Sequence, residues 1–191
     1  SGKYDVNKVA LIITQTGGGC RASNYIYLLR KALKKAGLEQ VPVISVNMSG
    51  LESASGFKLT VPLVRQIIAS LVYGDCIMCV SNQTRPYEFK KGTTDALIEK
   101  WNDALIEQFN RGQGPSNKDM RKNLAAIVDD FDAIERSREK KTRVGVVGEI
   151  YVKYSSLGNN GLEKFLRTQD CEYMLPGIMG FVLFKIDNRI E

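Results

Sequence analysis

The sequence predicts an α/β protein in which helices join parallel strands. Two apolar segments rich in β-branched residues, Val9–Gln15 and Val41–Asn47, lack the alternation of a half-exposed strand. That pattern is typical of strands buried on both faces of a parallel sheet. Apolar residues recur at helical spacing between Ala22 and Ala36, and Gly37 can adopt the left-handed conformation that ends a helix. Strand, glycine turn, helix and strand form a βαβ unit.

A run of helices is expected after this unit. Apolar residues gathered on one face predict helices at about 59–80, 93–109 and 118–134. Thr93 or Thr94 is the expected cap of the second of these helices. The three helices would form an insertion in the first lobe.

A second βαβ unit is expected beyond the charged run Arg136–Arg143, which has the composition of a solvated linker. Its expected elements are a strand at Arg143–Tyr154, a helix at about 160–168, a strand at Cys171–Pro176 and a helix from Gly177. The chain end cuts this last helix short.

These two units predict two Rossmann-like lobes built from parallel-sheet βαβ units. Residues 1–140 would form the first α/β lobe with its helical insertion, and residues 141–191 the start of a second lobe. The chain is therefore expected to be a fragment of a longer protein.

The composition argues against two kinds of binding partner, membranes and nucleic acids. The 191 residues are 43% hydrophobic and 25% charged, and no apolar run reaches the roughly 20 residues that cross a bilayer, so no membrane partner is expected. The formal net charge is +6, but the basic residues are scattered among acidic ones, which disfavours a nucleic-acid partner. No secretory signal opens the chain, and a cytoplasmic location is expected.

The chain contains no histidine. This removes the commonest general base, histidine-containing zinc sites, and Ser-His or Cys-His nucleophile pairs from this chain. Any chemistry must use other side chains, backbone amides or a cofactor. The four cysteines are widely spaced in a chain without an export signal, which favours free thiols or metal ligands over disulfides.

The stretch TGGGCRASN, which follows the first strand, is the main candidate site. Ligands of α/β proteins bind beyond the carboxyl ends of the strands, and glycines let backbone amides approach an anion closely. The site residues expected there are Gly17, Gly18, Gly19, Arg21 and Asn24, with Cys20 as a thiolate favoured by the helix N-terminus. The alternative is a tight turn that needs no ligand, because the stretch matches neither the P-loop nor the dinucleotide-binding fingerprint.

Other polar and sulfur-bearing residues have weaker patterns. Cys76 and Cys79 have C-x-x-C spacing on a predicted helix, where two buried thiols are favoured over an iron–sulfur or redox pair. Cys171 begins a predicted strand and is expected to pack. Glu149 and Asn159 would lie at the mouth of the second lobe, either facing the first lobe or as solvated turn residues.

Three segments, TQTGGGCRASNYIYLLRKAL, NQTRPYE and VGVVGEIYVKYSSLGNNGLEKFL, resemble the 2-hydroxyacyl-CoA dehydratase superfamily. The resemblance is to the dehydratase-like modules of acyl-CoA dehydratase activase-related proteins (2-hydroxyglutaryl-CoA dehydratase activator-related) and spans nearly the whole chain. It implies α/β lobes with an iron–sulfur cluster between them. It also implies an ATP-dependent, actin-like activase domain, fused or separate, as partner, and a CoA ester as ligand.

The resemblance implies a metal-ligating role for Cys20 alone, since Cys76 and Cys79 do not belong to the pattern of the family. One cysteine cannot hold a four-iron cluster, so the cluster is expected in the full-length protein rather than in this fragment. Three functions stay open. They are a module of a reductive dehydratase-like lyase or double-cubane system of anaerobic metabolism, a non-catalytic scaffold or docking module for the ATPase, and a nucleotide or acyl-CoA binder without metal.

Overall fold

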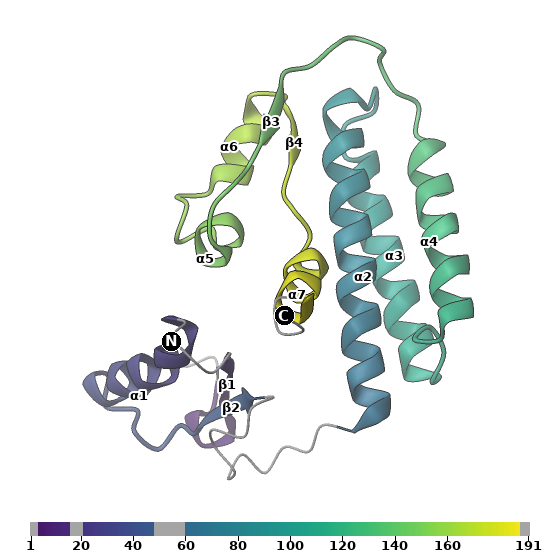
Figure 1. The fold of residues 1–191 in the computed structure, drawn as a ribbon. Coiled ribbons are helices and arrows are strands. Elements are labelled where there is room, and N and C mark those ends of the chain that lie inside the picture. Colours follow the sequence, from purple (N-terminus) through teal and green to yellow (C-terminus); the bar gives the residue numbers. More distant parts are fainter. Residues whose placement is uncertain (1–3, 16–20, 48–59, 188–191) are drawn as a thin grey trace. The chain divides into compact units, whose positions relative to one another are not determined.

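The computed structural model describes residues 4–15, 21–47 and 60–187 (Figure 1). The chain divides into two compact units, Ser1–Leu59 and Thr60–Glu191. Each unit contains helices and one two-stranded parallel sheet among its described residues, so the protein has a mixed α/β fold. The lobe boundary expected at residues 140 and 141 lies inside the second unit.

The first unit is a parallel βαβ unit. Strands β1 (Leu11–Gln15) and β2 (Val43–Asn47) pair in parallel over their whole length, and helix α1 (Tyr25–Lys35) connects them. Short 3₁₀ turns lie at η1 (Val6–Lys8) and η2 (Arg21–Asn24). The predicted strand–helix–strand order is confirmed, and the predicted glycine turn at residues 16–20 lies outside the described residues.

Two further predictions for this first unit have opposite outcomes. Gly37 has a φ of 67°, as predicted for the residue that ends a helix in the left-handed conformation. The prediction that the first strand is buried on both faces is wrong within the described unit, because Ile12 is 60% exposed. A single helix covers only part of a two-stranded sheet, so the rest of the sheet surface stays exposed.

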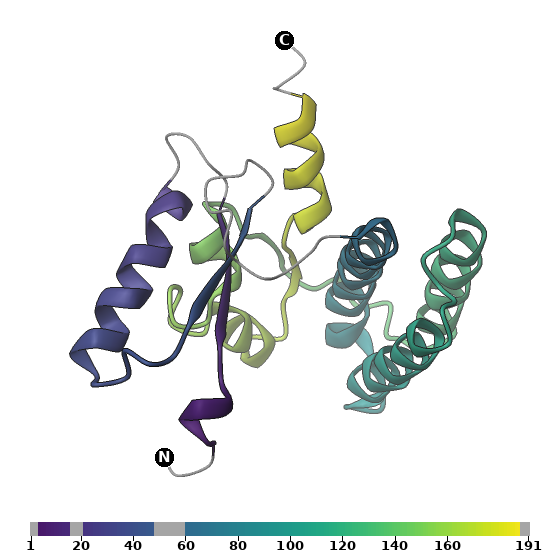
Figure 2. The ribbon, with the colours of Figure 1, turned by 90° about the horizontal axis from the view of Figure 1, so that it is seen from below.

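The second unit begins with three helices that pack together (Figure 2). They are α2 (Val61–Thr84), α3 (Thr93–Asn110) and α4 (Asn117–Asp132), and the turn η3 (Arg85–Tyr87) follows α2. All three helices were predicted from their apolar periodicity. Their buried core consists of Ala69, Tyr73, Ile77, Trp101, Leu105, Ile127 and Phe131.

Tyr73 makes two hydrogen bonds within this three-helix core. Its hydroxyl donates to the Gly114 carbonyl at 2.8 Å and accepts from the Asn123 amide at 3.0 Å. Burial raises the pKa of Tyr73, so the hydroxyl remains a neutral donor. The first bond joins α2 to the loop between α3 and α4, and the second joins α2 to α4.

The cap of α3 differs from the prediction. Gly92 precedes the helix with a φ of 93°, and neither threonine is its cap residue. The carboxylate of Glu88 instead accepts from the backbone amides of Gly92 at 2.8 Å and Thr94 at 2.7 Å. An acceptor from the preceding turn therefore does what a threonine cap would have done.

The rest of the second unit is a second parallel βαβ arrangement, as predicted. Strands β3 (Arg143–Gly145) and β4 (Glu172–Met174) pair in parallel. The helices are α5 (Ile150–Tyr154), α6 (Leu162–Thr168) and α7 (Ile178–Asp187). A small core of Val146, Leu166, Tyr173 and Leu175 packs against Met78 of α2, which joins this part to the three helices.

The prediction of one long strand at Arg143–Tyr154 is correct only for Arg143–Gly145 and wrong for the residues that follow. The strand ends at Gly145, and Ile150–Tyr154 forms helix α5. Gly148 has a φ of 137°, and the side chain of Glu149 accepts from the amide of Val152 at 3.2 Å. A glycine turn and a helix cap thus interrupt the apolar run.

One helical segment, Val61–Tyr87, is long and apolar enough to cross a membrane by length and composition. The expectation that no segment reaches that threshold is therefore not confirmed. The same segment packs against α3, α4 and α7 within the second unit, and 17% of its apolar stretch is buried.

The turn that precedes β4 provides a pH-dependent prediction. Asp170 accepts from Lys141 at 2.8 Å and from Lys91 at 3.3 Å, and the bond from Lys141 is the main cause that lowers its pKa. A lowered pKa in the folded state contributes stability above the unfolded pKa, and this contribution is lost as the pH falls through the folded pKa. Because Asp170 is 46% exposed, we expect the contribution to be below about 1 kcal/mol.

Asp170→Asn tests this, because asparagine tolerates the positive φ of 54° at this position. The free energy of unfolding of the variant should be lower than that of the wild type at neutral pH. The difference should shrink as the pH falls through the lowered folded pKa and disappear once the aspartate is protonated in both states. Asp103→Asn, on the exposed face of α3, is the control and should show no such trend. A difference that is constant with pH would contradict the ion-pair explanation.

Candidate functional site

The predicted glycine site lies at the carboxyl end of β1, but its central residues are not described. Gly17, Gly18, Gly19 and Cys20 lie outside the described residues. The flanking residues Arg21 and Asn24 belong to η2, which leads directly into α1. Asn24 is exposed and makes no capping hydrogen bond.

Gln15 links the two ends of this stretch and was not identified from the sequence. Its side-chain amide donates to the Ser23 carbonyl at 3.0 Å, and its side-chain oxygen accepts from the Ser45 hydroxyl at 2.6 Å. Gln15 and Ser45 are both buried. The glutamine therefore holds the end of β1, which precedes residues 16–20, against η2, which follows them. It also holds the end of β1 against β2. A polar residue that ends an apolar strand was the available sequence signal.

Glu149 and Asn159 have local roles in the second unit. Glu149 caps α5, as described above. The side-chain amide of Asn159 donates to the carbonyls of Val152 and Lys153 at 2.9 and 3.2 Å, and its oxygen accepts from the Leu162 amide at 3.0 Å. Asn159 thus joins the end of α5 to the start of α6. A role of either residue at a ligand site stays a prediction.

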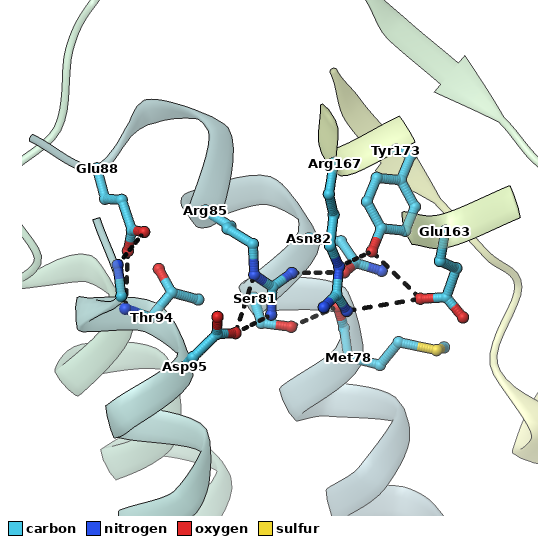
Figure 3. Close-up of polar contacts among 11 residues, drawn as sticks. Met78, Ser81, Asn82, Arg85, Glu88, Thr94, Asp95, Glu163, Arg167 and Tyr173 are labelled. Atoms are coloured by element: carbon cyan, nitrogen blue, oxygen red, sulfur yellow. Dashed lines mark hydrogen bonds and ion pairs between the residues drawn. The ribbon is translucent and has the colours of Figure 1, made fainter. Parts of the chain in front are cut away.

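The motif NQTRPYE spans the last residues of α2 and the start of the connection to α3 (Figure 3). Arg85 donates two hydrogen bonds to Asp95, at 2.8 and 3.1 Å, and one to the buried Asn82 at 3.2 Å. Arg85 is largely shielded from solvent. The arginine therefore fixes the end of α2 to the first turn of α3.

A second polar group faces this connection from the βαβ part of the same unit (Figure 3). Arg167 donates to the Tyr173 hydroxyl at 3.0 Å, and that hydroxyl donates to Glu163 at 3.2 Å. Burial raises the pKa of Tyr173. These contacts stabilise the packing. The four charged residues are two arginines and two carboxylates, so they leave no net charge for a ligand. They are Arg85, Asp95, Arg167 and Glu163.

The three cysteines in the described part of the chain are free thiols. Cys76 is partly buried, and burial is the main cause that raises its pKa, followed by the nearby Cys79. Cys79 is exposed and accepts a hydrogen bond from Gln83 at 3.3 Å. Among the described residues, no three Cys, Asp or Glu side chains come together in a group that could hold a metal ion.

No protein-family model matches this chain, and neither a curated protein nor a solved structure gives a match. The resemblance to the dehydratase superfamily therefore depends on the three sequence segments alone.

Proposed function

We propose that the chain is a dehydratase-like module with two Rossmann-like lobes, part of a reductive 2-hydroxyacyl-CoA dehydratase or double-cubane iron–sulfur system. The observation that supports this most is the parallel pairing of β1 with β2, because it puts the glycine-rich stretch after the carboxyl end of a parallel strand. Ligands of α/β proteins bind at that position. The resemblance of the three sequence segments supplies the reaction class.

The glycine-rich stretch would contact an anionic group such as part of a CoA ester. Backbone amides of Gly17, Gly18 and Gly19 can approach an anion without side-chain obstruction, and the helix that follows adds positive partial charge. Arg21 and Asn24 would orient the ligand. Gln15 contributes by holding both ends of the stretch.

An iron–sulfur cluster does not fit the described residues by themselves, since they contain no group of three candidate ligands. The proposal therefore assigns this chain a single ligand, Cys20, and requires the remaining ligands from other parts of the full-length protein. We derive no chemical step through the cluster. The implied partner is an ATP-dependent activase domain, fused or separate, in the cytoplasm.

The second candidate is a scaffold or docking module for an actin-like ATPase, without catalysis. Exposed apolar side chains in the second unit favour it. Val61, Ile67 and Ile68 of α2 and Leu183 and Phe184 of α7 are all exposed. Such side chains are typical of surfaces that bind another protein. In this function the cysteines would bind no iron.

Iron binding separates the two functions. In the full-length polypeptide prepared without oxygen, Cys20→Ser should lower the bound iron and acid-labile sulfide, because serine replaces the proposed thiolate ligand. Cys79→Ser, which removes an exposed thiol on α2, is the matched control and should leave the iron content unchanged. A wild-type protein without iron would contradict the dehydratase-like function and favour the docking module. Equal iron in wild type and Cys20→Ser would contradict the assignment of Cys20 as a ligand.

A further inference from the structure

A cleft in the second unit borders the NQTRPYE motif and contains no residue of the glycine-rich stretch. Its volume is about 570 Å³. Gln83 of α2 and Tyr87 of η3 line one side of it. The segment 136–140 lines it after α4, and Arg143 and Glu172 line it at β3 and β4. The volume is within the range of roughly 300–1,000 Å³ that is typical of small-molecule sites, and the cleft is shallow and largely open to solvent.

Backbone contacts hold the segment 136–140 against the α2–α3 connection. The amide of Ser137 donates to the Tyr87 carbonyl at 2.8 Å, and the amide of Phe89 donates to the Glu135 carbonyl at 3.3 Å. Glu88 and Arg136 form an antiparallel bridge between these two hydrogen bonds. The run that was predicted to be a solvated linker therefore forms one wall of the cleft.

The carboxylates of the cleft are already engaged. Glu172 accepts from the Tyr87 hydroxyl at 2.6 Å and from Arg143 at 3.1 Å. The bond to Glu172 is the main cause that raises the pKa of Tyr87. Glu139 is paired with Lys141 at 3.2 Å. Each carboxylate therefore has a cationic partner that offsets its negative charge.

Two cations of the cleft remain available. Arg136 is paired with Asp132, and Arg143 with Glu172. Arg138 and Lys140 line the cleft, are exposed, and have no ion-pair partner among the residues that the structure describes. An arginine and a lysine two residues apart on one wall can donate several hydrogen bonds to the same anionic group.

We propose that this cleft binds the phosphate groups of a phosphorylated small molecule, with Arg138 and Lys140 as the main contacts. Arginine and lysine are the residues that most often bind phosphate, and their bonds to it are assisted by charge. A nucleic-acid backbone is disfavoured, because such interfaces commonly use about 6–10 phosphate contacts. This site uses no cysteine and lies in a different unit from the glycine-rich stretch, so it is independent of the proposed function.

Calorimetric titration of the full chain with pyrophosphate at low ionic strength tests the proposal. We expect Arg138→Gln/Lys140→Gln to weaken pyrophosphate binding at least about tenfold, because two charged hydrogen-bond donors are removed. Arg121→Gln/Lys122→Gln is the matched control, since it removes the same two residue types from exposed positions near the start of α4. It should change the dissociation constant less than about twofold.

Three outcomes would overturn the proposal. The first is a wild-type chain that does not bind pyrophosphate even at about 10 mM. The second is an equal loss in both double variants, which would indicate a general effect of net charge. The third is a single-stranded RNA oligonucleotide that binds more tightly than pyrophosphate and is lost in Arg138→Gln/Lys140→Gln, which would assign the cleft to a nucleic acid.

Discussion

Glu88→Ala is expected to lower the free energy of unfolding of the second unit by about 3 kcal/mol, because each buried amide that loses its acceptor costs about 1–3 kcal/mol. Glu88 is only 5% exposed, and its two carboxylate oxygens accept from the amides of Gly92 and Thr94. Alanine leaves both amides without that acceptor at the start of α3. Glu88 also precedes Phe89, whose amide holds the chain at Glu135.

Urea unfolding followed by the fluorescence of Trp101 measures this effect. Trp101 is the single tryptophan of the chain, it is buried in the three-helix core, and it lies in the helix that Glu88 caps. Glu88→Gln retains one acceptor oxygen, so we expect an intermediate loss of stability.

Glu99→Ala is the control for this prediction. Glu99 is exposed on α3, so its replacement should change the free energy of unfolding by no more than about 0.5 kcal/mol. If Glu88→Ala were as stable as Glu99→Ala, the buried carboxylate would not be the cap that stabilises α3.

Gly177→Ala is expected to destabilise α7 by about 2 kcal/mol through the loss of its capping carboxylate. Asp75 of α2 accepts from the amides of Ile178 at 2.9 Å and Met179 at 2.8 Å, which are the first residues of α7. A methyl group on Gly177 would lie 2.5 Å from an oxygen of that carboxylate. The carboxylate must therefore move away from both amides, and α7 loses the negative charge at its N-terminus.

Hydrogen exchange measured on peptides of α7 detects this local effect. Exchange of its protected amides should accelerate about 30-fold, the factor that corresponds to about 2 kcal/mol. Gly180→Ala is the matched control in the same helix, because no atom lies within 4 Å of the added methyl group. Alanine is favoured over glycine inside a helix, so this control should leave exchange unchanged or slow it.

A double-mutant cycle identifies the cause. If Gly177→Ala acts by displacing Asp75, then Asp75→Ala should have a similar effect, and the double variant should be little worse than either single variant. Additive effects would show that the glycine and the aspartate stabilise α7 independently.

Local patterns were sufficient to predict most elements of this protein. The parallel β1–α1–β2 unit, the left-handed Gly37 and the three long helices all follow from the spacing of apolar residues and from glycine positions. These features depend on residues a few positions apart, and the sequence displays those directly. The position of the glycine-rich stretch after a parallel strand was predictable for the same reason, although its own residues lie outside those described.

The segment after Arg143 shows where local patterns were insufficient. An apolar run of this kind is compatible with either a strand or a helix. The structure ends the strand at Gly145 and starts α5 at Ile150, because Gly148 turns the chain and Glu149 caps the helix. The capping of α3 by Glu88 was also missed, since a carboxylate four to six residues before its partners is not among the usual cap patterns.

The charged run Arg136–Arg143 illustrates what only the tertiary structure decided. Its composition alone determined that it would be polar and lie at the surface. Its place beside Tyr87 and Glu172 depends on backbone hydrogen bonds to the α2–α3 connection and on the Tyr87–Glu172 bond, which joins residues 85 positions apart. Such pairings arise when separate helices and strands pack together, and no local spacing encodes them. The sequence therefore determined which charges were present, and the packing of α2, α4 and β4 determined that they line one cleft.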